Sequence, residues 1–227
     1  GMDHAPGEAH PQPSGFAVLL HNRRLLIFAA AMVTFHLANA AMLPLVGQEL
    51  ALQNTDVGTA LMATCIVAAQ VVMVPVAYVA GAKADSWGRK PIFLVGFAVL
   101  MARGFLYTLS DNSYWLVGVQ ILDGVGAGIF GALFPLVVQD LTHGTGRFNV
   151  SLAALTTAWG IGAALSNILA GWIVVVASYD VAFSSLGALA AVGLALYVVA
   201  MPETGPNAAT GPQNPVGNAS PKWGRRG

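Results

Sequence analysis

The chain has 227 residues, of which 56% are hydrophobic and 9% are charged, and its ten basic side chains balance its ten acidic ones. A soluble domain usually carries about 25% charged residues, so this composition excludes an ordinary soluble fold. The zero net charge gives no reason to expect a nucleic-acid partner, and the length indicates one main domain.

Polar segments flank the central part of the chain. Residues 1–22 are rich in Pro, Ala, His and Gly, without the basic start and apolar centre of a cleavable signal sequence. Residues 204–227 are rich in Pro and Gly and cannot bury much apolar surface. We expect a disordered cytoplasmic leader and a disordered cytoplasmic tail, on either side of a domain that covers residues 23–203.

Six apolar stretches lie between these segments, each about as long as the roughly 20 residues with which a helix crosses the bilayer core. None of them alternates apolar and polar residues, as the strands of a membrane barrel do. The sequence therefore predicts an all-α fold, a polytopic membrane bundle of six transmembrane helices. The stretches are residues 25–46, 57–80, 91–109, 114–141, 150–177 and 181–201.

The basic residues outside these stretches indicate the orientation of the helices, because Lys and Arg are retained on the cytoplasmic side. They occur only in alternate connections, and the connections on the other side carry acidic residues alone. We therefore expect a multi-pass protein of the cell inner membrane with both chain ends in the cytoplasm. The basic residues are Arg23, Arg24, Lys83, Arg89, Lys90, Arg147, Lys222, Arg225 and Arg226.

The connection over residues 81–90 contains a motif of spaced glycines and charges: Gly81, Asp85, Gly88, Arg89 and Lys90. Gly81 allows close contact between helices, and Gly88 allows a tight reversal of the chain. Asp85 ends a helix, where the helix dipole opposes its charge, so we expect Arg89 or the N-terminus of another helix to stabilise it. The alternative is a basic hairpin that merely follows the orientation rule.

This motif resembles the loop signature of the major facilitator superfamily, and it departs from the signature at Ser86, where a basic residue is usual. Residues 35–44 resemble the seventh helix of drug-efflux members, residues 123–128 resemble the tenth, and residues 202–204 resemble the exit from the last helix. The resemblance implies half of a major facilitator fold, the C-terminal one, with the motif as a conformational-switch loop. Members have twelve helices in two halves, so a missing N-terminal half or a homodimer partner is implied.

Arg103 and Asp123 are charged residues inside neighbouring apolar stretches. Counting about 1.5 Å of rise per residue from the two membrane surfaces places them at nearly the same depth. Because isolated charges in a bilayer are costly, we predict a salt bridge between them. The alternative is that Arg103 extends towards the surface while Asp123 faces a wet cavity.

Six further side chains within the stretches are candidates to line a substrate cavity near the middle of the membrane. The alternative is that they form hydrogen bonds between helices. They are His36, Asn39, Gln70, Thr157, Trp159 and Asn167.

The function expected is efflux-type transport of a small amphipathic solute across the lipid bilayer by a half unit, with Asp123 and His36 as candidate proton carriers. The alternative is a non-transporting membrane fragment or partner subunit that only associates with another half. An intramembrane enzyme is disfavoured, because the stretches contain no GxSxG or HExxH sequence and no His or Cys pair at metal-ligand spacing. No cofactor, metal or catalytic residue is expected.

Overall fold

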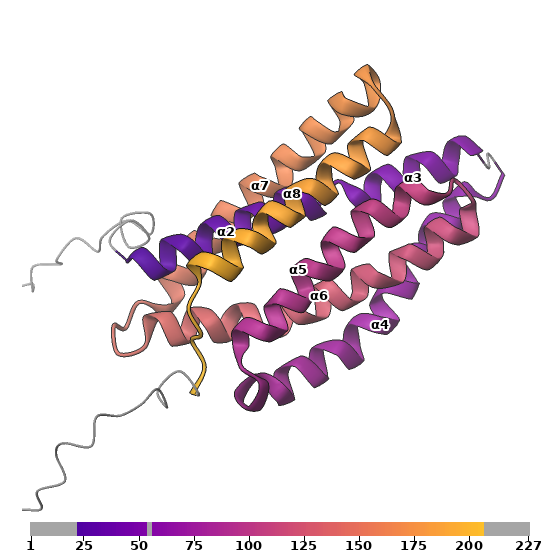
Figure 1. Cartoon of the computed structure of the whole chain (residues 1–227). Helices are drawn as coiled ribbons and strands as arrows, with labels where there is room; N and C mark the ends of the chain where they lie inside the picture. Colours follow the sequence, from indigo (N-terminus) through magenta and orange to yellow (C-terminus); the bar gives the residue numbers. More distant parts are fainter. Residues whose placement is uncertain (1–21, 54–55, 207–227) are drawn as a thin grey trace, which may run out of the picture.

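The computed structural model describes residues 22–53 and 56–206, and these form a bundle of α-helices (Figure 1). Within the described residues six helical stretches are long and apolar enough to cross a membrane, so the prediction of an all-α, six-span bundle is confirmed. The expectations for residues 1–21 and 207–227, including Lys222, Arg225 and Arg226, lie outside the described residues. The elements are α2 (Arg23–Asn39), α3 (Met42–Gln53), α4 (Gly58–Trp87), α5 (Arg89–Leu106), the short 3₁₀ helix η1 (Tyr107–Leu109), α6 (Ser113–Thr142), α7 (Phe148–Val176) and α8 (Tyr179–Ala200).

The first span is broken, whereas the sequence predicts an uninterrupted helix over residues 25–46. It consists of α2 and α3, which are separated at Ala40 and Ala41. The physical reason is Pro44, because in a continuous helix its ring would clash with the carbonyl of Ala40, four residues earlier. The backbone N–H of Ala41 donates instead to Oγ of the buried Ser166 on α7, at 3.1 Å.

The second span is longer than expected, and the prediction of a loop over residues 81–90 is wrong. Helix α4 continues to Trp87, α5 begins at Arg89, and Gly88 alone separates them. The 30 residues of α4 extend about 45 Å, more than the bilayer core of about 30 Å, so a polar helix end can lie in water. The predicted connection over residues 47–56 is likewise mostly helical, since α3 continues to Gln53.

Helices α4 and α6 pack closely because α6 presents glycines to α4. A Cβ atom at Gly128 would lie 2.7 Å from the carbonyl oxygen of Met73, and one at Gly124 would overlap the carbonyl oxygen of Ala69. Small residues allow this backbone approach in membrane bundles. The centre of the bundle is filled by packed aromatic rings, namely Phe28, Phe35, Phe93, Phe97, Phe130, Phe134 and Tyr197.

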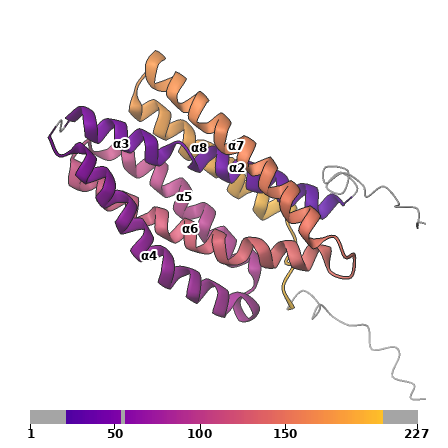
Figure 2. The same ribbon diagram turned by 180° about the vertical axis from the view of Figure 1, so that it is seen from behind.

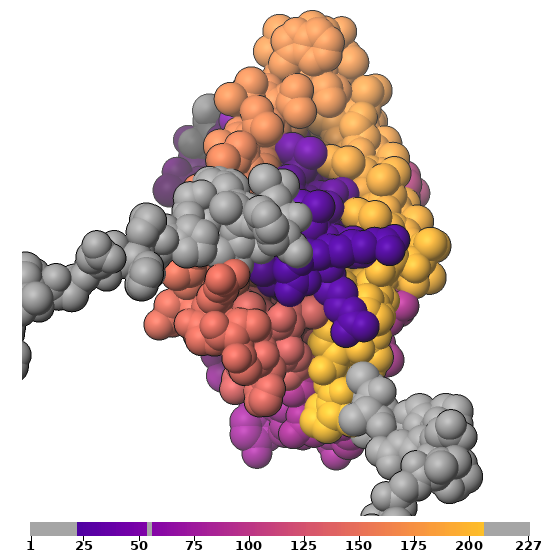
Figure 3. All heavy atoms as spheres, turned by 90° about the vertical axis from the view of Figure 1, so that its left-hand side faces the viewer, coloured from indigo at the N-terminus to yellow at the C-terminus, as the bar shows by residue number. Residues whose placement is uncertain are grey.

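Helices α4 and α7 lie at opposite edges of the bundle, as the front and back views both show (Figures 1 and 2). The end-on view has α7 at the upper edge and the α4–α5 region at the lower edge (Figure 3). In an apolar 18-residue stretch of each span, 11% of α4 and 17% of α7 is buried, against 39–50% for the other four spans. The two edge helices therefore leave most of their apolar surface to lipid or to another protein.

Candidate functional site

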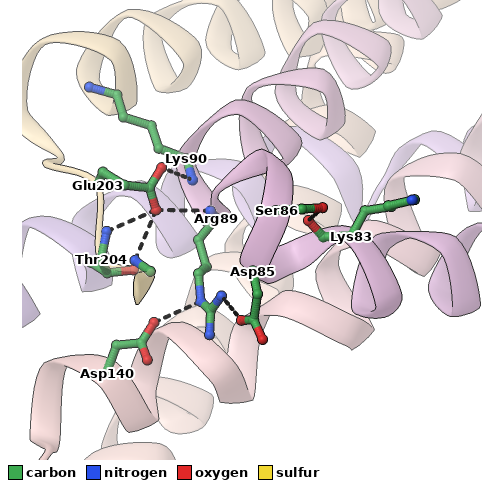
Figure 4. A network of polar contacts seen from close by, with 9 residues as sticks. Lys83, Asp85, Ser86, Arg89, Lys90, Asp140, Glu203 and Thr204 are labelled. Carbon is green, nitrogen blue, oxygen red and sulfur yellow. Dashed lines mark hydrogen bonds and ion pairs between the residues drawn. The ribbon is translucent and has the colours of Figure 1, made fainter. Parts of the chain in front are cut away.

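Arg89 is the centre of a cluster of polar contacts at the end of the bundle where α4 meets α5 (Figure 4). Its side chain is 7% exposed, its Nη1 donates to Oδ1 of Asp85 at 2.5 Å, and its Nε donates to Oδ2 of Asp140 at 2.8 Å. The Asp85 side chain is 76% exposed and that of Asp140 is 22% exposed. The Asp140 pair is therefore less weakened by water than the Asp85 pair, and the guanidinium joins α4, α5 and α6.

The carboxylate of Glu203, which follows α8, caps the N-terminus of α5. It accepts hydrogen bonds from the backbone N–H groups of Arg89 at 2.8 Å and Lys90 at 3.1 Å, and from those of Thr204 and Gly205. Burial acts to raise the pKa of Glu203, but these backbone donors outweigh it and hold the pKa below its usual range. An ionised carboxylate at a helix N-terminus is favourable, so Glu203 stabilises the start of α5.

Gly88 and Lys90 complete the attachment of α5 to the end of α8. Gly88 has φ of 89°, a conformation that favours glycine, and a Cβ atom there would lie 2.6 Å from Oε2 of Glu203. The Nζ of Lys90 donates to the carbonyl oxygen of Val198 at 2.7 Å. The turn between α4 and α5 is thus fixed to the chain that leaves α8. We call this group the Arg89 cluster: Asp85, Gly88, Arg89, Lys90, Asp140 and Glu203.

Gly81, the first of the five residues of the expected switch loop, takes no part in the Arg89 cluster. It is exposed within α4, and no described atom lies within 4 Å of a Cβ built on it. Within the described residues Gly81 therefore makes no close helix contact. The motif glycine that meets a neighbour is Gly88.

Sequence reasoning missed the roles of Asp140 and Glu203. Asp140 is an acidic residue near the end of α6, and Glu203 lies three residues after the end of α8. Both lie at the end of the bundle that carries the basic residues, so the need to balance Arg89 and Lys90 was the available signal. Neither is close to Arg89 in sequence, and only the packing of α6 and α8 brings them there.

A second polar network lies deeper in the bundle, around Arg103 of α5, which is 2% exposed. Its guanidinium forms an ion pair with Asp123 of α6 and donates to Oδ1 of Asn39 at 2.8 Å. Asp123 also accepts from Nε2 of Gln120 at 3.0 Å, and Oε1 of Gln120 accepts from the hydroxyl of Tyr107. The network thus joins α2, α5, η1 and α6 through groups that satisfy one another, as buried charges require.

The six expected cavity residues do not form one group. Asn39 is held by Arg103, as above, and the ring of His36 stacks on that of Trp159 with centroids 4.1 Å apart. Nε2 of His36 and Nε1 of Trp159 are buried, and neither has a hydrogen-bond partner in the described part of the chain. Gln70, Thr157 and Asn167 are exposed, and the last two donate to carbonyl groups of their own helix.

The described residues contain no group of three or more His, Cys, Asp or Glu side chains that could hold a metal ion. The chemistry that the two networks offer is ion pairing and hydrogen bonding between helices. Both networks therefore hold helices together in the arrangement that the structure shows.

Comparison with known proteins gives a match to the Major Facilitator Superfamily over residues 16–223. An "uncharacterized MFS-type transporter" of Mycobacterium tuberculosis is 80% identical over 204 residues, which are 90% of this chain and 49% of the relative. The chain therefore spans about half the length of that curated relative. Two more distant relatives are 28% identical: Multidrug transporter protein MdtP of Bacillus subtilis, over 42% of this chain and 18% of the relative, and Inner membrane transport protein YajR of Escherichia coli, over 55% and 27%.

The sequence match, the six spans and the polar motif between α4 and α5 agree with one another. They make the chain a multi-pass membrane protein of a family of transporters of small solutes. The chain belongs to the Major Facilitator Superfamily.

Proposed function

We propose that this chain is one six-helix half of a secondary transporter that exports a small amphipathic solute across the cell inner membrane. The observation that carries the proposal is the family match, which extends over all six spans. The distant likeness to the protein named Multidrug transporter protein MdtP favours export of an amphipathic solute. The basic residues at the Arg89 end of the bundle support a cytoplasmic location for both chain ends.

The second half of the transporter would pack on the exposed faces of α4 and α7. These two helices lie at opposite edges of the bundle, and the share of their apolar stretches that is buried is the smallest among the six spans of the described residues. A unit that contacts both helices would enclose a space bordered by α2 and α6. The solute would bind in this space, between the halves. Rocking of the halves would open the space to one side of the membrane or the other. The second unit is the N-terminal half of a longer protein, or a second copy of this chain.

The Arg89 cluster would act as the conformational switch of this half. It fixes α4, α5, α6 and the exit of α8 to one another, so this end of the bundle moves as one body. The Asp85 side chain is 76% exposed, so a helix N-terminus of the second half can approach it. That contact would hold the transporter in the state that is closed at this end.

Asp123 and His36 are the proposed proton carriers. Protonation of Asp123 would weaken its ion pair with Arg103 and release the hydrogen bonds to Asn39 and Gln120. The protonation state of Asp123 would thus be coupled to the positions of α2 and α6. His36 contributes a buried ring nitrogen that lacks a partner among the described residues. Asp123→Asn keeps the shape of the side chain and removes its charge, so it should abolish dependence of transport on a proton gradient.

The second candidate function is that of a non-transporting membrane fragment or partner subunit. It is favoured by one observation, that the chain spans about half the length of its 80% identical relative. The two functions differ in whether the assembled halves move a solute.

The experiment is ethidium uptake into inverted membrane vesicles. The chain is produced with the part of the Mycobacterium tuberculosis relative that lies outside the matched region, and the two must co-purify. Ethidium uptake driven by an imposed proton gradient, and lost in Asp123→Asn, supports the transporter. Co-purified halves that accumulate no more ethidium than vesicles without them would instead favour the non-transporting subunit.

A further inference from the structure

A crevice of about 500 Å³ lies between α4 and α5, with α6 at its base. All the residues that line it are apolar, and those of α4 and α5 that are exposed include Val79, Val95 and Trp87. In a bundle that spans a membrane such a crevice faces hydrocarbon. Its lining residues are Pro75, Val76, Val79, Ala80 and Trp87 of α4, Pro91, Ile92 and Val95 of α5, and Val125 and Ile129 of α6.

The length of the crevice matches one leaflet of a bilayer. Its α4 wall extends from Pro75 to Trp87, and twelve residues of helix rise about 18 Å. Half of a bilayer core is about 15 Å thick. The crevice therefore covers the depth over which one lipid tail extends from the membrane surface to the midplane.

The outer end of the crevice carries an aromatic ring and a positive charge. Trp87 is 59% exposed, and Nζ of Lys83 lies 6.0 Å from the centroid of its ring. Lys83 is one helical turn from both Trp87 and Val79, so all three share the face of α4 that borders the crevice. Tryptophan prefers the membrane interface, and lysine there attracts anionic lipid headgroups.

We propose that this crevice is a binding site for an anionic phospholipid. One acyl chain lies against Val76, Val79 and Val95, and the phosphate lies beside Lys83 and Trp87 at the end of α4. The proposal uses the apolar lining, the leaflet length and the single charge at the outer end. It does not depend on whether the chain transports a solute.

The geometry of α4 favours a lipid here over a second protein unit. The exposed apolar face that a partner half would cover contains Val67, Val71, Val74 and Tyr78. Lys83 is nine residues after Val74, which is two and a half turns at 3.6 residues per turn, so the two lie on opposite sides of α4. A protein bound to the Val74 face leaves the crevice open to lipid.

The test measures quenching of Trp87 by phospholipids with brominated acyl chains. The purified chain is placed in bilayer nanodiscs of phosphatidylcholine, and brominated phosphatidylglycerol or brominated phosphatidylcholine is added in increasing mole fraction. The Trp87 signal is the difference between the unaltered chain and Trp87→Phe. The variants are Lys83→Gln with Arg24→Gln as its exposed control, and Val79→Phe, which fills the crevice, with Val74→Phe as its control.

Brominated phosphatidylglycerol should reach half-maximal quenching of Trp87 at about one fifth the mole fraction that phosphatidylcholine needs, the ratio that about 1 kcal/mol per surface lysine gives. Lys83→Gln should remove this preference and Arg24→Gln should keep it. Val79→Phe should reduce quenching by both lipids, and Val74→Phe should not. Three outcomes would overturn the proposal: equal quenching by the two lipids, a preference that survives Lys83→Gln, or no quenching of Trp87 by either lipid. The last outcome would indicate that protein covers the crevice.

Discussion

Glu203 Oε1 lies 2.8 Å from the backbone nitrogen of Arg89, a residue 114 positions earlier in the chain. The first turn of α5 is thus capped by a carboxylate that follows the last span in the sequence. This contact makes the end of α8 part of the motif between α4 and α5. It also makes the cap sensitive to any movement of α8 relative to α5.

Replacement of Glu203 should test the cap directly. Glu203→Gln removes the charge that faces the N-terminus of α5, and we expect a loss of about 1 kcal/mol of folding free energy, with a lower Tm in detergent. Asp111→Asn, at an exposed acidic residue outside the Arg89 cluster, is the matched control and should leave Tm unchanged. Equal Tm values for the two variants would mean that the Glu203 cap does not stabilise the bundle.

The same carboxylate predicts a pH dependence of stability. Its folded-state pKa is depressed, so its contribution is fully present above the ordinary glutamate value of about 4.3 and is lost as pH falls towards the lower folded-state pKa. Between pH 5 and pH 3 the unaltered chain should therefore lose more Tm than Glu203→Gln does. Parallel Tm curves over this range would show that Glu203 titrates normally in the folded chain.

Gly88 and Gly81 should respond in opposite ways to the same substitution. Gly88→Ala places a methyl group at φ of 89° and 2.6 Å from Glu203 Oε2, so it should destabilise the chain by about 1–3 kcal/mol. Gly81→Ala replaces a helical glycine with open space around it and should stabilise by about 0.5–1 kcal/mol. Unfolding free energies of both variants check this, and a destabilising Gly81→Ala would contradict the structure.

Arg103 and Asp123 should show strong coupling in a double-mutant cycle. Arg103→Met or Asp123→Leu alone leaves one buried charge without its ion-pair partner, at a cost of about 3–5 kcal/mol. The double variant should lose much less than the sum, because it leaves neither charge behind. Unfolding of the four proteins in detergent gives the coupling energy, and additive losses would mean that the pair is not formed.

The contact between α4 and α6 can be tested at two glycines of one helix. A Cβ atom at Gly128 would lie 2.7 Å from the carbonyl oxygen of Met73, whereas no described atom lies within 4 Å of one at Gly131. Gly128→Ala should destabilise by about 1–3 kcal/mol as an overpacked contact. Gly131→Ala should be neutral or slightly stabilising, and equal effects of the two on Tm would argue against this packing.

Composition and apolar length predict the fold class because a bilayer-spanning helix needs both and little else. They do not predict the break at Ala40, which depends on Pro44 and on the hydrogen bond that the backbone N–H of Ala41 donates to Ser166, in a helix far along the chain. The end of α4 was misplaced because helices continue beyond the apolar region. Residue counting indicated the depth of Arg103 and Asp123 correctly, since helical rise is constant.

The contacts of Asp140 and Glu203 with Arg89 could not be predicted from the sequence. Asp140 and Glu203 reach Arg89 only because α6 and α8 end beside it. Gln70, Thr157 and Asn167 are exposed, and no periodic pattern distinguishes a helix face that meets lipid from one that meets a second half. The sequence therefore suggested one substrate cavity for side chains that do not lie together in this bundle.

The most direct test of the central claim is the oligomeric mass of the purified chain in detergent, followed by ethidium flux in liposomes at the same assembly state. We predict that a monomeric chain carries no flux and that pairing with a second six-helix unit, a copy of itself or the other half, restores it. A monomer that transports ethidium would contradict the claim that this chain is one half of a transporter.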